Sequence, residues 1–327
     1  MHKNRFKLEK LTGIAAITIS LIVLAIAPIL IKLVEDELSP NATIFNRLFG
    51  AAIFFGMGSI LSRSKSQKSN HSVVKETTKK DYLLLFAAGF CFWGTQVSWA
   101  WSLPRTSVAI SELLHNFTPL FVILGSWLIA RQQFNLNFLL GTGLSIIGSC
   151  LIGIEHLSYS SGQIQGDTAA ILSATFLAAY LITVETLCQK FSKSTIMFWV
   201  CTTGSILSIP VLFIARMQWF PFSFKGWVFA LSLVLTMVLG QGLCLYAIEQ
   251  LGANLFAVLL LLTPVLAAIA AWFIFSEILS YLDWGAMAIV LVGVYLAISS
   301  RSHSSALELA EDQSKKNIKD QKEQLRI

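Results

Sequence analysis

Long apolar runs recur along the whole chain and are separated by short polar or charged segments. An α-helix rises about 1.5 Å per residue, so about twenty apolar residues cross the roughly 30 Å hydrocarbon core of a bilayer. With 55% hydrophobic and 13% charged residues, the composition indicates an integral membrane protein. We predict ten spans: 11–34, 42–62, 81–103, 107–130, 137–155, 167–189, 195–215, 226–248, 252–275 and 281–300.

The first apolar run follows a short basic segment, residues 1–10. The run is too long for the core of a signal peptide, and no A-x-A-like cleavage site follows it. We therefore interpret 11–34 as the first transmembrane helix and residues 1–10 as a cytoplasmic N-terminus.

The chain repeats itself. A shift of 145 residues, without a gap, aligns several pairs of residues: Gln96 with Gln241, Thr118 with Thr263, Pro119 with Pro264, Trp127 with Trp272, and Gly148 with Gly293. The copies cover 11–155 and 167–300, with five spans each. Because five is odd, the second copy must enter the membrane in the opposite orientation. The sequence therefore predicts an all-α membrane protein of ten transmembrane helices, arranged as two inverted five-helix repeats.

The distribution of Lys and Arg predicts the orientation. Nineteen of them lie in the N-terminus, in the 62–80, 131–136 and 190–194 loops, and in the tail, whereas the alternate loops carry three. Positive residues stay on the cytoplasmic side, so both termini are expected there. The charged tail, 301–327, is too polar to span the membrane.

The second copy carries a further pattern. Its mid-span Thr-Pro is followed by Ser276-Glu277 and then by a helix with two spaced glycines. This pattern resembles the signature of EamA-type carriers in the drug/metabolite transporter superfamily. The resemblance covers about residues 11–300, implies a carrier of small metabolites, and implies a structural turn role for Glu277.

The first copy departs from the family pattern, because Gln132 stands where Glu277 stands in the second. Arg47, in FNRLFGAA, matches the opening of the family's second helix, with Leu48 in place of the usual Phe. The substrate does not follow from the resemblance, since the family carries many metabolites.

The predicted fourth helix holds an unusual polar set. Glu112, His115, Asn116 and Pro119 are spaced so as to share one face of a helix. The repeat-related residues are apolar apart from Pro264, so the fold itself needs only the proline. Polar groups in hydrocarbon are costly and mark functional sites. We interpret Glu112 as lining a substrate cavity, where alternate burial and hydration would let it exchange a proton. The alternative is a structural carboxylate.

Five further residues are candidates for substrate binding or coupling, and each has a structural alternative. Gln96 and Gln241 either contact substrate or hydrogen-bond across the repeat axis. Trp93 either walls the cavity or packs between helices. Tyr180 needs a partner for its hydroxyl at mid-span. Arg47 either anchors its helix near the headgroups or attracts anions at the cavity mouth.

Prolines at mid-span remove a helix hydrogen bond and favour a kink, so Pro119 and Pro264 are predicted hinges. Glycines at 141, 148, 153, 285 and 293 favour close helix packing or formation of a homodimer.

Several function classes lack support. The chain has no phosphate-binding Gly-rich loop, no nucleophile elbow and no HExxH motif, and its five cysteines lie in apolar runs without ligand spacing. We therefore expect no cofactor, no metal, no enzymatic activity and no nucleic-acid partner.

The function that these features favour is a secondary carrier of the bacterial cytoplasmic membrane that exports a small polar metabolite such as an amino acid, coupled to a proton or sodium ion. Two alternatives remain. One is a drug/proton antiporter, which is disfavoured because the first helix has no acidic residue before Glu35. The other is a membrane scaffold or sensor, for which an intramembrane carboxylate would serve no purpose.

Overall fold

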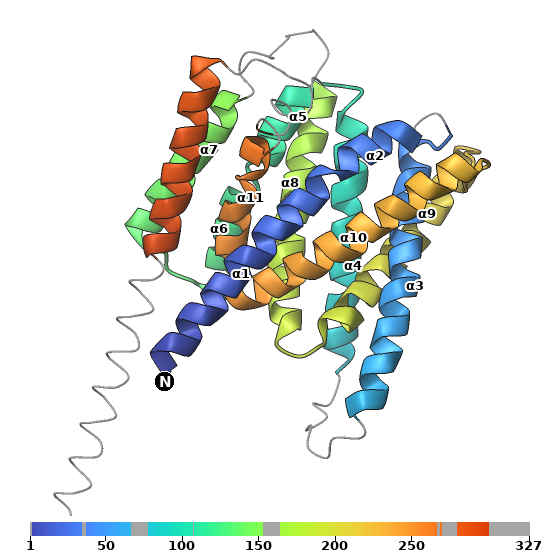
Figure 1. The fold of residues 1–327 in the computed structure, drawn as a ribbon, viewed down its shortest axis with the longest axis horizontal. Helices are drawn as coiled ribbons and strands as arrows, with labels where there is room; N and C mark the ends of the chain where they lie inside the picture. Colours follow the sequence, from blue (N-terminus) through green and yellow to red (C-terminus); the bar gives the residue numbers. More distant parts are fainter. Residues whose placement is uncertain are drawn as a thin grey trace, which may run out of the picture.

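The computed structural model describes residues 2–34, 37–66, 78–106, 108–152, 164–266, 269 and 280–300, and every regular element in these ranges is an α-helix (Figure 1). In chain order these are α1 (His2–Ala25), α2 (Ala27–Val34), α3 (Pro40–Ser66), α4 (Lys79–Ser102), α5 (Val108–His115), α6 (Thr118–Ala130), α7 (Leu136–Ile152), α8 (Ile164–Cys188), α9 (Lys193–Ile214), α10 (Phe224–Leu251), α11 (Ala253–Leu260) and a last helix, Tyr281–Ser300.

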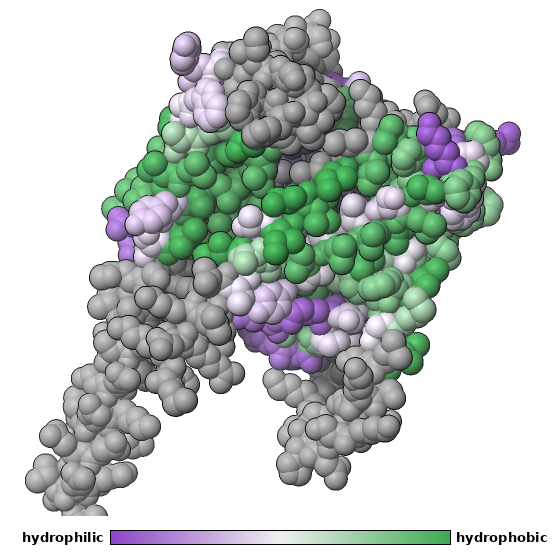
Figure 2. Space-filling model, in the orientation of Figure 1, coloured by the Kyte–Doolittle hydropathy of each residue, from purple (hydrophilic) through white to green (hydrophobic). Residues whose placement is uncertain are grey.

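Within these ranges, seven helical stretches are long and apolar enough to cross a membrane, and three shorter ones are apolar too. Together they fit the ten predicted spans, and the prediction of an all-helical, multi-pass membrane protein is confirmed. Figure 2 shows hydrophobic residues in a broad band over one face of the bundle, with hydrophilic residues toward its edges. Large apolar side chains such as Ile60, Leu231 and Ile214 are exposed, as expected where lipid rather than water surrounds the helices.

The helical region that corresponds to the first predicted span, 11–34, is longer than the prediction and is divided into two helices. Its helix already begins at His2, and α1 ends at Ala25 before α2 restarts at Ala27. Pro28 is the second residue of α2. A proline cannot continue the hydrogen bonds of the preceding turn, which explains the interruption.

The two halves of the chain pack in matching pairs. α4 packs on α8 and α9, while α10 packs on α1 and α3; α3 also packs on α9. The counterparts in the two halves are α1 and α8, α3 and α9, and α4 and α10. The α4–α8 contact therefore corresponds to the α10–α1 contact, and the α4–α9 contact to the α10–α3 contact. Figure 1 shows α1 and α10 lying side by side.

Single contacts repeat in the same way. A Cβ on Gly166 would lie 2.7 Å from the backbone of Arg105, and one on Gly13 would lie 3.0 Å from Leu251. Gly13 and Gly166 are 153 residues apart. The same separation relates Ser20, which donates to the α10 backbone, and Ser173, which donates to the α4 backbone. The counterparts of α1 and α3 therefore lie 153 residues along the chain, eight more than the shift that relates the later helices. The difference arises because α3 is five residues longer than α9 and the α3–α4 connection is three residues longer than the α9–α10 one.

The last helix of each half crosses the other at small residues. A Cβ on Gly148 would lie 2.9 Å from the Ala286 carbonyl oxygen, and one on Gly293 would lie 2.6 Å from that of Gly141. Higher numbers in α7 thus meet lower numbers in Tyr281–Ser300, so the two helices run antiparallel. At the centre, Ser145 Oγ lies 3.4 Å from the Val290 carbonyl oxygen, to which it donates. Small residues let helices approach closely in lipid, and three of the predicted packing glycines do so here.

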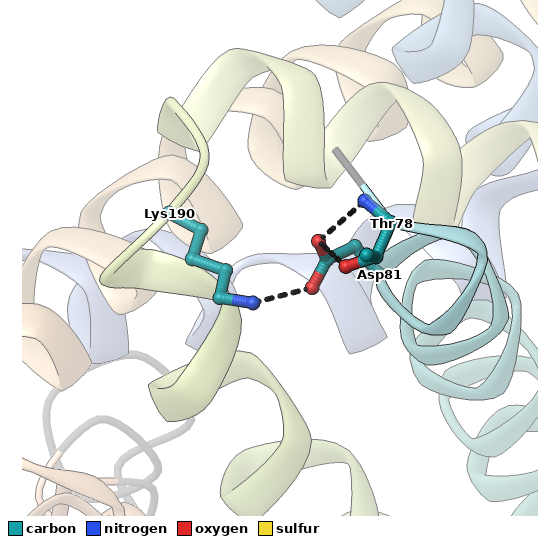
Figure 3. Close-up of polar contacts among 3 residues, drawn as sticks. All are labelled: Thr78, Asp81 and Lys190. Carbon is teal, nitrogen blue, oxygen red and sulfur yellow. Dashed lines mark hydrogen bonds and ion pairs between the residues drawn. The ribbon is translucent and has the colours of Figure 1, made fainter. Parts of the chain in front are cut away.

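Polar ties hold the first turns of α4 and α10. Asp81 caps α4 by accepting from the Thr78 backbone at 3.0 Å, and it forms an ion pair with Lys190 at 2.7 Å (Figure 3). At the start of α10, Glu37 accepts from the backbone N–H groups of Phe222 and Ser223 at 3.2 Å each, and from the Ser223 hydroxyl. That hydroxyl bond, helped by the backbone donors, holds the pKa of Glu37 below its usual value.

Candidate functional site

The predicted fourth helix is broken at its Thr-Pro. α5 ends at His115, residues 116–117 form a turn, and α6 begins at Thr118 with Pro119 next. The Thr118 hydroxyl donates to the His115 carbonyl at 2.7 Å, which satisfies one acceptor that the proline leaves free. The predicted kink thus takes the form of a two-residue turn that contains Asn116, whose backbone N–H still donates to the Glu112 carbonyl at 2.9 Å.

The second half has the same break. α11 ends at Leu260, and the Thr263 hydroxyl donates to the Leu260 carbonyl at 2.6 Å. Pro264 follows it as Pro119 follows Thr118. In span 252–275 the helix is interrupted by a two-residue turn at 261–262. The part of that span after 266 lies almost entirely outside the described residues, as does Glu277.

A cavity of about 250 Å³ lies at these breaks. It is lined by Thr95, Gln96 and Trp99 of α4, Glu112 and His115 of α5, Asn116, Thr118 and Pro119 at the first break, Leu177 of α8, and Ala257, Leu260, Leu261 and Thr263 of the second half. The structure thus brings together four predicted binding candidates, Gln96, Glu112, His115 and Asn116, and one predicted hinge, Pro119. The α11 side of the cavity is mostly apolar, so its polar chemistry comes from the first half.

Hydrogen bonds position three of the polar side chains. His115 Nδ1 lies 3.1 Å from Ser173 Oγ on α8, and Asn116 Nδ2 donates to Ser149 Oγ on α7 at 2.9 Å. The indole of Trp99 is a hydrogen-bond donor to the Glu112 carboxyl. His115 and Asn116 are therefore tied to neighbouring helices, and Glu112 is tied only to another wall of the cavity among the residues with described side chains.

Three other candidates lie elsewhere. Tyr180 is 2% exposed, and its hydroxyl lies 3.9 Å from the sulfur of Met197. Trp93 donates from Nε1 to Ser208 Oγ at 3.0 Å and packs toward α9. Gln241 is half-buried on α10. None of these three lines the cavity at the breaks, and Gln96 does so without its repeat-related partner.

Arg47 lines a neighbouring cavity of about 360 Å³. Its other lining residues are Ile31, Pro40, Thr43, Ile44, Gln96, Trp99, Ala100, Leu103 and Pro104. Gln96 and Trp99 line both cavities, so the two spaces share a wall. Sequence reasoning missed Trp99 and Thr43. Trp99 follows Gln96 by three residues and Thr43 precedes Arg47 by four, so helical spacing could have pointed to both.

No group of three or more His, Cys, Asp or Glu side chains that could hold a metal ion occurs in the described part of the chain. The polar side chains that line the cavity can bind a ligand through hydrogen bonds and through the one carboxyl group of Glu112. Broken helices around a polar cavity are typical of secondary transporters.

Comparison with known proteins agrees with this geometry. Two stretches, residues 11–154 and 164–299, match the EamA-like transporter family. The chain belongs to the EamA-like transporter family. The resemblance read from Thr-Pro and the spaced glycines is thereby confirmed, and the protein is a multi-pass membrane protein of a transporter family.

Two similar proteins extend the comparison. One is a protein of Archaeoglobus fulgidus called an uncharacterized transporter, which is 26% identical over 207 residues, covering 61% of this EamA-like chain and 70% of the relative. A solved crystal structure superposes with a TM-score of 0.70 over 90% of this chain and 99% of the other, at 15% identity. At that identity the likeness shows the fold alone.

Proposed function

We propose that this protein is a secondary carrier of the bacterial cytoplasmic membrane that exports a small polar metabolite, such as an amino acid. Transport proceeds by alternating access between two inverted five-helix repeats, with both termini in the cytoplasm. The observation that carries the proposal is the cavity at the helix breaks, where Glu112, His115 and Asn116 lie across from an apolar wall of the other half.

The packing of the two halves supports the inverted arrangement. α7 and Tyr281–Ser300 hold the same place in their repeats and run antiparallel, with Ser145 and Val290 at the crossing. Two equivalent helices that run antiparallel require an axis perpendicular to them, which lies in the membrane plane. An axis along the membrane normal would make them parallel.

The broken helices support a mechanism of rocking. Each Thr-Pro interrupts the regular hydrogen bonds of its helix, so the segments on either side can change their relative angle more easily than two parts of a continuous helix. Pro119 and Pro264 then act as paired hinges beside the cavity. Such a motion would hydrate and bury Glu112 in turn, so we assign to this carboxyl the coupling of transport to a proton; a sodium ion is the alternative.

The antiporter of drugs and the scaffold or sensor fit these observations less well. A scaffold would not need a carboxyl group beside a cavity at mid-helix breaks, where an unused polar group costs free energy. No observation on the described residues favours either over a metabolite carrier.

The test begins with metabolite profiling of cells with and without the gene, which identifies the solute. Purified protein in liposomes is then assayed for uptake of that solute under imposed proton and sodium gradients. Glu112→Gln keeps the size and most hydrogen bonds but removes the charge, so we expect transport to be lost while expression stays near normal; His115→Gln should give a smaller loss.

Glu185→Gln on α8 is the matched control, because Glu185 does not line the cavity, and it should transport at the wild-type rate. If Glu112→Gln moved the solute at the wild-type rate with the wild-type pH dependence, Glu112 would be a structural group and the site assignment would be wrong.

A further inference from the structure

Arg47 is a partly buried cation that has no partner among the residues the structure describes. Its Nε is inaccessible and makes no hydrogen bond, and the side chain has no hydrogen bond or ion pair with any residue whose side chain is described. A guanidinium carries five N–H donors and keeps its charge, and in a membrane helix it normally pairs with an acid or with backbone carbonyls. A guanidinium beside a cavity with its Nε buried and unpaired among the described residues points to a ligand that supplies acceptors.

Thr43 adds a second unpartnered group at the same place. Its side chain is 4% exposed, and Oγ1 is buried without a hydrogen bond among the described residues. It precedes Arg47 by one turn of α3, and both line the cavity of about 360 Å³. Two neighbouring unsatisfied groups lining one cavity are unusual, since buried polar groups are nearly always paired.

The fold does not need these two polar residues. The counterparts of α3 residues lie 153 positions later, so Thr43 corresponds to Ile196 and Arg47 to Val200 on α9. Both counterparts are fully buried aliphatic side chains of the core. The same helix crossing is therefore built without charge in one half, and Arg47 and Thr43 are explained better by a ligand than by packing.

We propose that Arg47 and Thr43 form a subsite that binds the carboxylate of the transported substrate. The proposal rests on the carrier function and names its substrate class: molecules that carry one carboxylate and no second negative charge. One guanidinium balances one negative charge, whereas a phosphate dianion would leave charge uncompensated. The rest of the cavity lining has no charged side chain: it is apolar apart from Gln96 and Trp99.

The subsite connects directly with the cavity at the helix breaks. Gln96 and Trp99 line both spaces, so a carboxylate at Arg47 leaves the remainder of the molecule next to the wall that leads to Glu112. An ammonium group beside the carboxylate would be attracted toward Glu112, so molecules with both groups belong to this class.

The test uses binding of three small probes with one skeleton to purified protein in lipid nanodiscs, measured by calorimetry. L-Leucine has both charged groups, 4-methylpentanoate lacks the ammonium group, and 3-methylbutylamine lacks the carboxylate. We expect both carboxylates to bind and the amine to bind about 10-fold more weakly or worse, since a hydrogen-bonded charge pair contributes about that much. Inorganic phosphate, the fourth probe, should not compete with them.

Variants locate the effect. Arg47→Gln should weaken binding of both carboxylates about 10- to 100-fold, Arg47→Lys should weaken it less, and Thr43→Val should weaken it about 3- to 10-fold. Arg105→Gln is the control, because Arg105 is exposed over the ring of Trp101 and lines neither cavity. Each variant is used only if its thermal unfolding matches wild type; Arg47→Lys keeps the charge should Arg47→Gln fail to fold.

Wild-type protein that binds neither carboxylate, Arg47→Gln protein with unchanged affinity, or stronger binding of phosphate than of carboxylate would each overturn the subsite. The carrier proposal fails separately: Arg47-dependent binding without any transport in liposomes would reject the carrier and keep the subsite. Transport of a solute that binds wild type and Arg47→Gln with the same affinity would reject the subsite and keep the carrier.

Discussion

The hydroxyl of Ser173 on α8 donates to the backbone carbonyl of Thr95 on α4 at 2.9 Å. The other half of the chain repeats this bond, because Ser20 on α1 donates to the carbonyl of Gly240 on α10 at 2.9 Å. Both serines are fully buried. The two bonds differ only in their second contacts: Ser173 Oγ also lies 3.1 Å from His115, and Ser20 Oγ lies 2.9 Å from the sulfur of Cys244.

Substitutions of these two serines should distinguish an effect on stability from an effect on transport. Ser20→Ala and Ser173→Ala should each lower stability by about 0.5–1.5 kcal/mol, because each removes one interhelical hydrogen bond. Only Ser173→Ala should also slow transport, since it frees the ring of His115. Thermal unfolding in detergent and uptake in liposomes measure the two effects. Equal transport losses in the two variants would contradict the assignment of His115 to the site.

The crossing of α7 with Tyr281–Ser300 should be intolerant of larger side chains. Gly148→Ala would place a Cβ 2.8 Å from the backbone nitrogen of Val290, and we expect a loss of about 1–3 kcal/mol. Gly143→Ala on the same helix is the control, because no atom lies within 4 Å of its Cβ. It should be neutral or stabilising by up to about 1 kcal/mol, since alanine favours a helix over glycine. Thermal unfolding distinguishes the two.

The two partners of the ion pair at the start of α4, Asp81 and Lys190, should contribute unequally to stability. The Asp81 side chain is 2% exposed and also caps the helix at Thr78, whereas that of Lys190 is 45% exposed. Asp81→Asn should therefore cost about 1–3 kcal/mol and Lys190→Gln less than about 1 kcal/mol. A double-mutant cycle on unfolding free energies tests this, and a larger effect of Lys190→Gln would refute it.

Stability should depend on pH through Glu37. Its pKa is lowered in the folded protein, chiefly by the Ser223 hydroxyl, so on acidification the unfolded state takes up the proton first. The stabilisation is present above the usual Glu pKa of 4.5 and is lost as pH falls through the lower folded value. Wild type should therefore exceed Glu37→Gln in stability at neutral pH, with the difference shrinking below about pH 4.5. Unfolding measured across pH checks this, and a constant difference would be contrary to it.

Hydrophobic run length located all ten spans because lipid permits few alternatives to a helix of membrane-crossing length. The breaks were only partly predicted. Pro119 and Pro264 indicated a kink, but the two-residue turn at each site also depends on the threonine that satisfies the freed carbonyl, and on neighbours that hold two short segments in place.

Sequence predicts which side chains reach the cavity where they lie close together on one helix. It does not do so where the position of a neighbouring helix selects between two side chains. Glu112, His115 and Asn116 cluster on a short stretch of chain, so their common cavity follows from local spacing. On α4, Gln96 has Trp93 and Trp99 at equal spacing on either side. Only the position of α9, which supplies Ser208 to Trp93, decides that Trp99 reaches the cavity.

The two walls of the cavity belong to copies joined on one polypeptide. A substitution at Glu112 therefore changes one wall and leaves its counterpart, Ala257, as it was. A carrier assembled from two identical five-helix chains would change both walls at once, and any charge added to one would face the same charge on the other. Fusion of the halves thus permits an acidic side chain on one wall and an apolar surface on the other. Substitutions in the first half can then change substrate specificity while the hinge at Pro264 stays the same.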